Sequence, residues 1–255
     1  MVMSSSNSRV AWITGASSGI GRALALKLAR DGYRVAVSAR NADELQALAL
    51  ESGGVIQAFP LDVTDRDAVH RVMSEIEAAL GPIDMAVFSA GTYVRESISN
   101  FNADQFRTMI ELNLMGTAYC LETIMPLMVA RGKGRIGLLG SVSGYTGLPG
   151  GGVYGATKSA LITLAEALHP GLAKKGVTLS IINPGFVKTP LTDKNDFPMP
   201  FIVTAEEAAD HIAKGMAAGK FEIAFSWKMV LLLKSLRLLP YPLYFRLTEK
   251  MLRKS

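Results

Sequence analysis

Cysteine is almost absent from this sequence, because Cys120 is the only one among 255 residues. A single cysteine cannot form an intrachain disulfide or supply a cysteine-based metal cluster. The three histidines, His70, His169 and His211, are scattered, and none has the spacing of metal ligands. We therefore expect no metal site, and a reducing compartment such as the cytoplasm fits the chain.

Long hydrophobic runs are also lacking. No segment approaches the roughly 20 consecutive apolar residues of a membrane-spanning helix. Residues 1–8 are polar and lack the apolar centre of a secretory signal, so we expect them to be a disordered lead-in. The length of 255 residues and the 49% hydrophobic content are typical of one large α/β domain with a single core.

An excess of positive charge is missing from most of the chain. Residues 1–220 contain 20 basic and 20 acidic side chains, whereas residues 221–255 contain 7 and 2, so the net charge of +5 resides in the last segment. A neutral body gives no electrostatic reason to expect nucleic-acid binding. The last segment mixes leucines and aromatic residues with lysine and arginine, which predicts a basic amphipathic C-terminal extension over residues 221–255.

Short apolar runs alternate with segments of helical periodicity through the first 220 residues. Strands are predicted over residues 10–13, 34–38, 55–60, 85–89, 134–139 and 178–183. Helices are predicted over residues 21–30, 43–51, 66–80, 103–130, 153–175 and 205–218. His169-Pro170-Gly171 should bend or interrupt the fifth helix. This alternation predicts right-handed crossovers and an α/β fold over residues 9–220, with a parallel sheet covered on both faces.

A glycine-rich turn joins the first predicted strand to the first predicted helix and reads TGASSGIG over residues 14–21. Glycine lets a ligand approach the main chain closely, and the N-terminus of a helix attracts negative charge. Gly15 can form the turn, Gly19 can face a pyrophosphate, and Gly21 can let the helix pack closely on the strand. The spacing differs from the common G-x-G-x-x-G motif, and a plain turn of small residues is the alternative.

Tyr154 and Lys158 lie four residues apart, so both side chains project from one face of the predicted helix. A phenol titrates near ~10, and a neighbouring cation favours the phenolate and lowers its pKa. Ser141 follows the strand 134–139, at the edge where open parallel sheets bind ligands. A hydroxyl there can stabilise charge on a substrate oxygen. Ser143 is a rival hydroxyl, and a solvated Tyr–Lys pair without chemistry is the alternative for the helix.

These motifs resemble those of the short-chain dehydrogenase/reductase family in order and in spacing. The resemblance runs from about residue 9 to residue 189 and rests on residues 14–21, 61–63, 89–91, Asn113, Ser141 and 154–158. It implies a Rossmann-type, doubly wound sheet of about seven strands, and a homodimer or homotetramer. It also implies hydride transfer between a nicotinamide cofactor and a carbonyl or alcohol carbon.

The resemblance assigns four catalytic residues: Asn113, Ser141, Tyr154 and Lys158. In the reductive direction, Ser141 steadies the substrate oxygen and Tyr154 donates its proton to it. Lys158, together with Asn113 and a water molecule held by it, resupplies that proton. A mid-helix asparagine would otherwise be expected to face solvent.

The end of the second strand indicates the cofactor. Ala39 stands where an NAD-type site has a carboxylate, and Arg40 follows, so a 2′-phosphate would be bound and not repelled. We therefore expect NADP(H), unless Arg40 is only a solvated loop charge. By resemblance, Asp62 and Val63 contact the adenine. The predicted cofactor-binding residues are Gly15, Ser17, Ser18, Gly19, Ile20, Gly21, Arg40, Asp62, Val63, Ser89, Ala90, Gly91, Tyr154, Lys158, Pro184, Gly185, Val187 and Thr189.

In this family the segment after Thr189 covers the substrate, which makes residues 190–202 the predicted lid. Its apolar and aromatic side chains favour an apolar substrate, unless they simply pack on the core. Tyr145, Leu148 and Phe186 are expected to face the same cleft. Ser89 departs from the family, which usually has asparagine there, but a hydroxyl can still bond backbone groups at a strand end.

Two sets of alternatives stay open. The extension can pack on its own monomer, cover the cleft, join a partner subunit or lie peripherally on an anionic membrane surface. The chain as a whole can be an oxidoreductase, a non-catalytic NADP(H)-binding regulatory protein, or another enzyme class on the same fold. The complete set of four catalytic residues argues against the regulator. The glycine spacing argues against epimerases and dehydratases, which usually belong to longer relatives.

Overall fold

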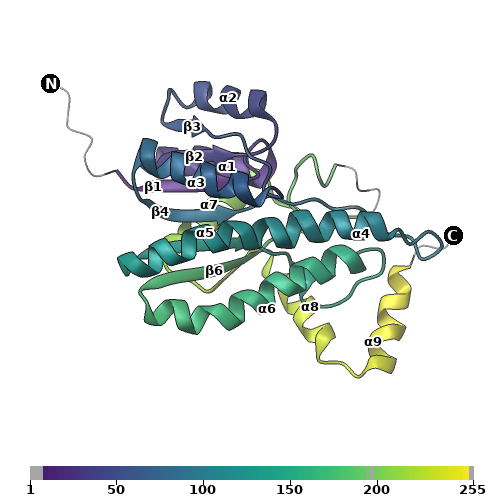
Figure 1. Cartoon of the computed structure of the whole chain (residues 1–255). Coiled ribbons are helices and arrows are strands. Elements are labelled where there is room, and N and C mark those ends of the chain that lie inside the picture. The colour runs from purple at the N-terminus through teal and green to yellow at the C-terminus, as the bar shows by residue number, and fades with distance from the viewer. Residues whose placement is uncertain (1–7, 194, 196–197, 253–255) are drawn as a thin grey trace.

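The computed structural model describes residues 8–193, 195 and 198–252 (Figure 1). Its centre is a parallel sheet of seven strands in the order β3-β2-β1-β4-β5-β6-β7. The strands are β1 (Val10–Thr14), β2 (Arg34–Ser38), β3 (Ile56–Ala58), β4 (Ile83–Phe88), β5 (Gly134–Leu139), β6 (Val177–Asn183) and β7 (Glu222–Ala224). The predicted doubly wound α/β sheet is confirmed. The lead-in expected over residues 1–8 lies, apart from Ser8, outside the described residues.

Helices cover both faces of the sheet, so each strand is buried on two sides. Side chains alternate along β1, where Ala11 and Ile13 enter one core while Val10 and Trp12 enter the other. The first core lies under α1 (Gly19–Arg30), α2 (Ala42–Glu51) and α7 (Ala205–Ala217). The second core lies under α3 (Arg66–Leu80), α5 (Gly116–Arg131) and α6 (Gly152–Lys174).

The strand order determines where a ligand can bind. β1 pairs with β2 on one side and with β4 on the other. The chain therefore builds the sheet outward in one direction from β1 and then in the other from β4. In open parallel sheets, ligands bind in the crevice beyond the carboxyl ends of strands at such a switch. The turns that follow β1 and β4 carry Gly15 and Ser89, respectively.

The long helix predicted over residues 103–130 is not one regular helix. It consists of α4 (Ala103–Ile110), a π-helical turn η1 (Glu111–Met115) and α5. A π-turn inserts an extra residue into the helical repeat and often occurs at functional sites. Asn113 is its middle residue and is fully buried, so the alternative that this asparagine faces solvent does not hold.

The same helical run departs from the expectation that no segment is apolar and long enough to span a membrane. By length and composition alone, residues 103–131 are apolar enough to cross a bilayer, and 44% of the most apolar window is buried inside the protein. Cys120 and Ile124 of this run are fully buried in the second core. The burial is that of a core helix, because these side chains already pack against the sheet.

Helix α6 continues past the proline that was expected to bend or interrupt it, and ends at Lys174. A proline at this position removes one hydrogen bond to the carbonyl four residues earlier. That carbonyl belongs to Glu166, and both Glu166 and Pro170 are exposed. Water can therefore replace the lost donor, and the helix is not interrupted.

The C-terminal part begins with a strand that the sequence did not reveal. β7 pairs with β6 through Ile182 and Ile223, so the sheet extends beyond the boundary expected at residue 220. The helices that follow are α8 (Trp227–Arg237), α9 (Tyr241–Thr248) and the 3₁₀ turn η3 (Glu249–Met251), which confirm a helical extension. They project from one corner of the molecule (Figure 1).

The extension is attached to the turn that carries Ser141. Met229 and Leu233 of α8 are buried against Val142 and Tyr145. The Tyr145 hydroxyl donates to Glu222 Oε1 at 2.6 Å, and Lys234 Nζ donates to the other oxygen of that carboxylate at 2.6 Å. These contacts join the sheet edge, the turn and α8 into one packed unit.

Candidate active site

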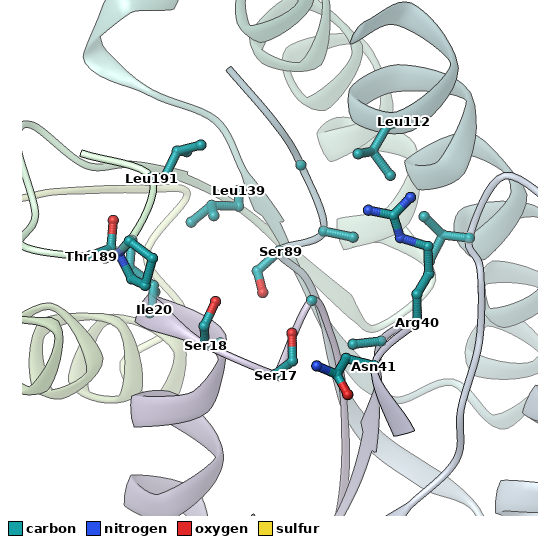
Figure 2. A pocket seen from close by; sticks show the side chains of 18 of the residues that line it. Ser17, Ser18, Ile20, Arg40, Asn41, Ser89, Leu112, Leu139, Thr189 and Leu191 are labelled. Atoms are coloured by element: carbon teal, nitrogen blue, oxygen red, sulfur yellow. The ribbon is translucent and has the colours of Figure 1, made fainter. Parts of the chain in front are cut away.

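A pocket of about 320 Å³ opens beyond the carboxyl ends of β1 and β4 (Figure 2). Thirteen of the predicted cofactor-binding residues line it: Gly15, Ser17, Ser18, Gly19, Ile20, Gly21, Arg40, Asp62, Val63, Ser89, Ala90, Gly91 and Thr189. The pocket therefore brings together motifs that are up to 174 residues apart in the sequence. It coincides with the crevice expected from the strand order.

The start of α1 forms one wall of the pocket and leaves its N-terminus uncapped. Ser18 precedes the helix but makes no capping hydrogen bond, and its first turn contains no acidic residue. By contrast, Asn41 and Asp65 cap α2 and α3 through their side chains. The first N–H groups of α1 and its positive dipole end therefore face the pocket, as an anion-binding site requires.

Two glycines let this wall pack closely on the end of β4. Gly15 has φ +68°, a left-handed conformation that favours glycine, and an added Cβ would lie 2.6 Å from the Ala90 nitrogen. A Cβ on Gly21 would lie 2.8 Å from Ser89 Oγ. Both positions match the roles expected from the sequence, since Gly15 forms the turn and Gly21 lets the helix pack on the strand.

Arg40 and Asn41 lie at the opposite end of the pocket, where β2 ends. Figure 2 shows the Arg40 side chain reaching over the pocket, with the Ser17 and Ser18 hydroxyls directed into it. Arg40 is exposed, and within the described residues it forms no ion pair with a carboxylate. A guanidinium held beside hydroxyl groups and free of a carboxylate suits a phosphate.

The departure at Ser89 is accommodated as expected. The Ser89 hydroxyl donates to the Thr14 carbonyl at 2.5 Å, and the neighbouring Ala90 N–H donates to Thr14 Oγ1 at 3.4 Å. These bonds hold the ends of β1 and β4 together at the floor of the pocket. Asp62 is held in its own turn, because its Oδ1 accepts from both the N–H and the hydroxyl of Thr64.

Ser141 begins the 3₁₀ turn η2 (Val142–Gly144) directly after β5. Its hydroxyl oxygen accepts the Ser143 N–H at 3.1 Å, so Ser141 helps to hold its own turn. Ser141 also lies close enough to Tyr154 to lower the pKa of that phenol. Because the backbone already donates to the Ser141 oxygen, its proton is available for donation outward.

Tyr154 lies in the first turn of α6, and its ring packs edge-on against Tyr93 with centroids 5.3 Å apart. Burial raises the pKa of Tyr154 to about 12, which outweighs the effect of the nearby Ser141 hydroxyl that lowers it. The expected lowering of this pKa by Lys158 is therefore wrong for the chain alone. The phenol is protonated at neutral pH.

Lys158 lies one turn further along α6 and is buried. Its Nζ lies 5.5 Å from the centroid of the Tyr154 ring and donates to the Leu139 carbonyl at 2.7 Å. Burial lowers the pKa of Lys158 to about 8, because a charged ammonium loses its water there. Lys158 thus connects helix α6, which carries Tyr154, to Leu139, which lines the pocket.

Asn113 lies beside Lys158, but its side chain forms hydrogen bonds with Thr92 and Thr157 and not with the lysine. Its Oδ1 accepts the Thr92 N–H at 2.8 Å, and its Nδ2 donates to the Thr92 carbonyl at 3.0 Å and to Thr157 Oγ1 at 3.2 Å. A Cβ on Gly91 would lie 3.2 Å from Asn113 Oδ1 and 3.6 Å from Lys158 Nζ. The side chain of Asn113 therefore fixes the strand-end loop against the helix that carries Tyr154.

Five predicted cofactor-binding residues do not line the pocket: Tyr154, Lys158, Pro184, Gly185 and Val187. Pro184 and Gly185 instead contact neighbouring turns. The Pro184 carbonyl accepts the Val142 N–H at 3.0 Å, and a Cβ on Gly185 would lie 3.3 Å from Met229 Sδ. Thr192 holds the loop after Val187, because its hydroxyl donates to the Val187 carbonyl at 2.6 Å and accepts the Thr189 N–H at 3.0 Å.

Pro190 and Leu191, which also line the pocket, belong to the predicted lid, and Ala39 and Leu61 belong to the motifs used above. Sequence reasoning missed the remaining three lining residues: Asn41, Leu112 and Leu139. Most are neighbours of predicted site residues, and that proximity was the only available signal. Leu112 and Leu139 resemble any core leucine in the sequence, and only the fold places them at the rim of the pocket (Figure 2).

The expected lining of the substrate cleft is only partly present. Tyr145, Leu148 and Phe186 pack with α8 in a small apolar cluster. In the predicted lid, Leu191 lines the pocket, whereas Phe201 is exposed. Residues 194, 196 and 197 of that lid lie outside the described residues.

A loop that the sequence did not single out is fixed to the start of α6. The Glu96 carboxylate accepts the N–H of Gly152 and, at 3.1 Å, that of Val153. The Tyr93 hydroxyl donates to the Gly150 carbonyl at 3.3 Å. Glu96 therefore caps the helix that carries Tyr154, from 56 residues away.

Comparison with known proteins gives a matching family and several similar relatives. The model of the family described as short chain dehydrogenase matches residues 9–198. An uncharacterized oxidoreductase of Myxococcus xanthus is 37% identical over 239 residues, which cover 92% of this chain and 94% of the relative.

Two solved structures are similar over most of the chain. A short-chain dehydrogenase from Streptomyces avermitilis superimposes with a TM-score of 0.83 at 26% identity and covers 97% of this chain and 98% of that one. ElxO, solved with NADP bound, gives 0.78 at 26% identity and covers 86% and 98%.

Proposed function

The chain belongs to the short-chain dehydrogenase family, and from this premise we propose that it is an NADP(H)-dependent oxidoreductase. It transfers a hydride between the cofactor and a carbonyl or alcohol carbon of an apolar small molecule. The observation that carries the proposal is that Ser141 and the buried Lys158 both lie beside Tyr154. The amine of Lys158 donates to the carbonyl of Leu139, which lines the pocket. The proton donor and the groups that can bind an anion therefore lie at the same edge of the sheet.

The residues present fit a dinucleotide. Gly15 and Gly21 let the turn and the start of α1 pack against the end of β4, where a Cβ would clash, and the uncapped N-terminus of α1 offers N–H groups to a pyrophosphate. Asp62 and Val63 would flank the adenine, and Thr189 would hold the nicotinamide end. Arg40 at the end of β2 favours NADP(H) over NAD(H), and the similarity to ElxO with NADP bound agrees with that preference.

The chemistry follows from the protonation states in the reductive direction. When bound, a reduced nicotinamide would supply the hydride that the carbonyl carbon receives. Ser141 donates a hydrogen bond to the carbonyl oxygen, because its own oxygen already accepts the Ser143 N–H. Tyr154, protonated at neutral pH, transfers its proton to that oxygen as negative charge develops there. The ammonium of Lys158 lies near the phenol and offsets the charge left on it.

The pocket and the family support three further parts of the proposal. Leu112, Leu139 and Leu191 line the rim of the pocket and favour an apolar substrate. We expect a cytoplasmic enzyme that works as a homodimer or homotetramer, as family resemblance implies. Asn113 acts by fixing the loop at Thr92 against α6, and any water it holds would connect Lys158 with solvent.

The second candidate is a non-catalytic NADP(H)-binding regulatory protein on the same fold. It shares the cofactor pocket but needs no protonated Tyr154 beside Ser141. Steady NADPH oxidation across a panel of apolar ketones and aldehydes separates the two. Turnover with any carbonyl supports the oxidoreductase, whereas tight NADPH binding without turnover across the panel supports the regulator.

A further inference from the structure

The extension presents an apolar face that nothing in the described chain covers. Three side chains of α8 and its C-cap, Trp227, Leu231 and Leu238, follow one another at intervals of 4 and 7 residues and so share one side of the helix. Trp227 is 69% exposed and Leu238 is 85% exposed. Burial of Met229 and Leu233 on the opposite side leaves this stripe directed to solvent.

Exposed aromatic rings also occur on α9, which follows α8 in the chain, and on the predicted lid. Tyr241 is 74% exposed, and its ring stacks on that of Phe245 at 5.5 Å. On the other side, Lys228 Nζ lies 5.6 Å from the centroid of the exposed Phe201 ring. We define the C-terminal apolar face as these six residues: Phe201, Trp227, Leu231, Leu238, Tyr241 and Phe245.

Charge determines what can cover this face. Residues 222–252 contain five basic side chains and two acidic ones, Glu222 and Glu249, of which Glu222 is paired with Lys234, whereas residues 1–220 are neutral. A second copy docked through the same face would bring like charges together, because a symmetric contact places the same surface on both sides. An acidic, apolar and extended partner is required, and the surface of an anionic bilayer has these properties.

We propose that the C-terminal apolar face docks on anionic lipid bilayers. Trp227, Tyr241 and Phe245 enter the interface, where aromatic rings are favoured, and Leu231 and Leu238 bury their side chains beside them. Arg246 and Lys250 are exposed and approach the lipid phosphates. The hairpin of α8 and α9 projects from the body, so this face can reach a flat surface (Figure 1).

Docking would bring the lid to the membrane. The Ser226 hydroxyl donates to the Phe201 carbonyl at 3.2 Å, and both residues have left-handed backbone, with φ +72° and +58°. Such conformations cost free energy in residues other than glycine and persist only where surrounding contacts hold them. The lid and the start of α8 are therefore fixed to each other at the edge of the proposed surface.

The test is co-sedimentation of the full-length protein with vesicles. Phosphatidylcholine vesicles are compared with vesicles that also contain phosphatidylserine, at low and at high salt. We expect binding to the anionic vesicles at low salt and release as salt screens the attraction. Leu231→Ser/Leu238→Ser should weaken binding at least about tenfold, because two apolar side chains no longer enter the interface.

Matched controls use equally exposed residues elsewhere. Leu50→Ser on α2, where Leu50 is 82% exposed, should bind as the wild type does. Arg246→Glu/Lys250→Glu should abolish binding, whereas Lys174→Glu/Lys175→Glu at the far end of α6 should leave most of it. Both leucine variants should oxidise NADPH with water-soluble carbonyls as the wild type does.

Three results would overturn the proposal. The first is no binding to anionic vesicles at low salt. The second is equal binding to both kinds of vesicle, which would remove the role of charge. The third is a dimer that Leu231→Ser/Leu238→Ser dissociates in size-exclusion chromatography without any vesicle binding, since a second copy would then cover the face.

Discussion

Burial shifts the pKa values of two neighbouring side chains at the active site in opposite directions. Burial raises the pKa of Tyr154 to about 12 and lowers that of Lys158 to about 8. The phenol therefore keeps its proton at neutral pH, which suits reduction of a carbonyl. Lys158 is mostly protonated at pH 7, although its burial disfavours the charged form. The charge that the chemistry uses therefore lowers the stability of the fold.

Lys158→Met should stabilise the fold and remove activity. A pKa lowered from 10.5 to about 8 corresponds to on the order of 3 kcal/mol of unfavourable burial at pH 7. Part of this is offset by the lost bond to the Leu139 carbonyl, and we expect a rise in Tm of several degrees. Thermal unfolding of both proteins at pH 7 measures it, and a lower Tm for the variant would contradict the burial argument.

The same shift predicts how stability depends on pH. Between about pH 8 and pH 10.5 the unfolded chain binds a proton on Lys158 that the folded chain does not, so this residue makes stability rise with pH in that range. The unfavourable term is complete below about pH 8. The higher Tm of Lys158→Met relative to the wild type should therefore disappear as the pH rises through this window. A difference in Tm that does not change with pH would contradict the lowered pKa of Lys158.

Arg40 tests the cofactor preference. Arg40→Ala should raise KM for NADPH at least about tenfold, because a charge-assisted hydrogen bond is worth about 1.5–3 kcal/mol. KM for NADH should change little, since NADH has no 2′-phosphate. Equal changes for the two cofactors would show that Arg40 does not contact that phosphate. Arg22→Ala, which breaks an exposed ion pair with Glu51 outside the pocket, is the control.

At the scale of elements, the active site depends on where helices begin and change pitch. The start of α1 is left uncapped and faces the pocket, while the start of α6 is capped by Glu96 from a distant loop. The π-turn η1 directs Asn113 inward, where it binds Thr92. These three features hold the turns around Tyr154 in place.

Glu96→Ala should lower kcat severalfold and destabilise the protein by about 1 kcal/mol, the usual value of a helix cap. The loss removes two acceptors at the start of α6, so Tyr154 is held less firmly. Glu96→Gln keeps one acceptor and should recover part of kcat. Glu75→Ala on the exposed side of α3 is the control. An Ala variant with wild-type kcat and Tm would show that the cap does not position Tyr154.

Periodicity predicted the elements that are long or strongly apolar. The strands at residues 34–38 and 134–139 and the helix at 66–80 have the predicted bounds. β7 was missed because its three residues, Glu222–Ala224, include one buried side chain and no alternation. The π-turn was missed because a single inserted residue leaves the apolar pattern around Asn113 helical.

The site was predictable where a motif fixes the backbone. Gly15 and Gly21 lie where their motif requires, because only glycine fits there. The pKa of Tyr154 was not predictable, since its burial, which only the fold reveals, raises that pKa more than Ser141 lowers it. Glu96 was missed for the same reason: its partners at the start of α6 lie 56 residues away, and only the fold joins them.

At the scale of the whole molecule, the C-terminal part divides into a structural and an accessory portion. Ile223 of β7 is buried in the first core, and Glu222 accepts from Tyr145 and Lys234. The pKa of Glu222 is held below its usual value by these donors, which outweigh its partial burial. α9, by contrast, contacts the body chiefly through Tyr244, whose hydroxyl accepts a hydrogen bond from Thr146 at 3.1 Å.

Truncation should separate these portions. A chain ending at Lys220 loses β7 and uncovers Val142 and Tyr145, so we expect it to misfold or aggregate. A chain ending at Leu239 keeps β7 and α8 and should fold and bind NADPH. Circular dichroism and NADPH titration of both chains measure this, and a stable, NADPH-binding chain ending at Lys220 would contradict the assignment of β7 to the core.

The central claim is that this protein reduces carbonyls with NADPH and that Tyr154 supplies the proton. The most direct measurement is NADPH oxidation with the best carbonyl of a panel, for the wild type and Tyr154→Phe, together with the NADPH dissociation constant of each. Loss of a general acid typically lowers the rate ~10²–10⁴-fold. We predict a kcat reduced by at least about a hundredfold with an unchanged dissociation constant. A variant that keeps more than about a tenth of kcat would contradict the account.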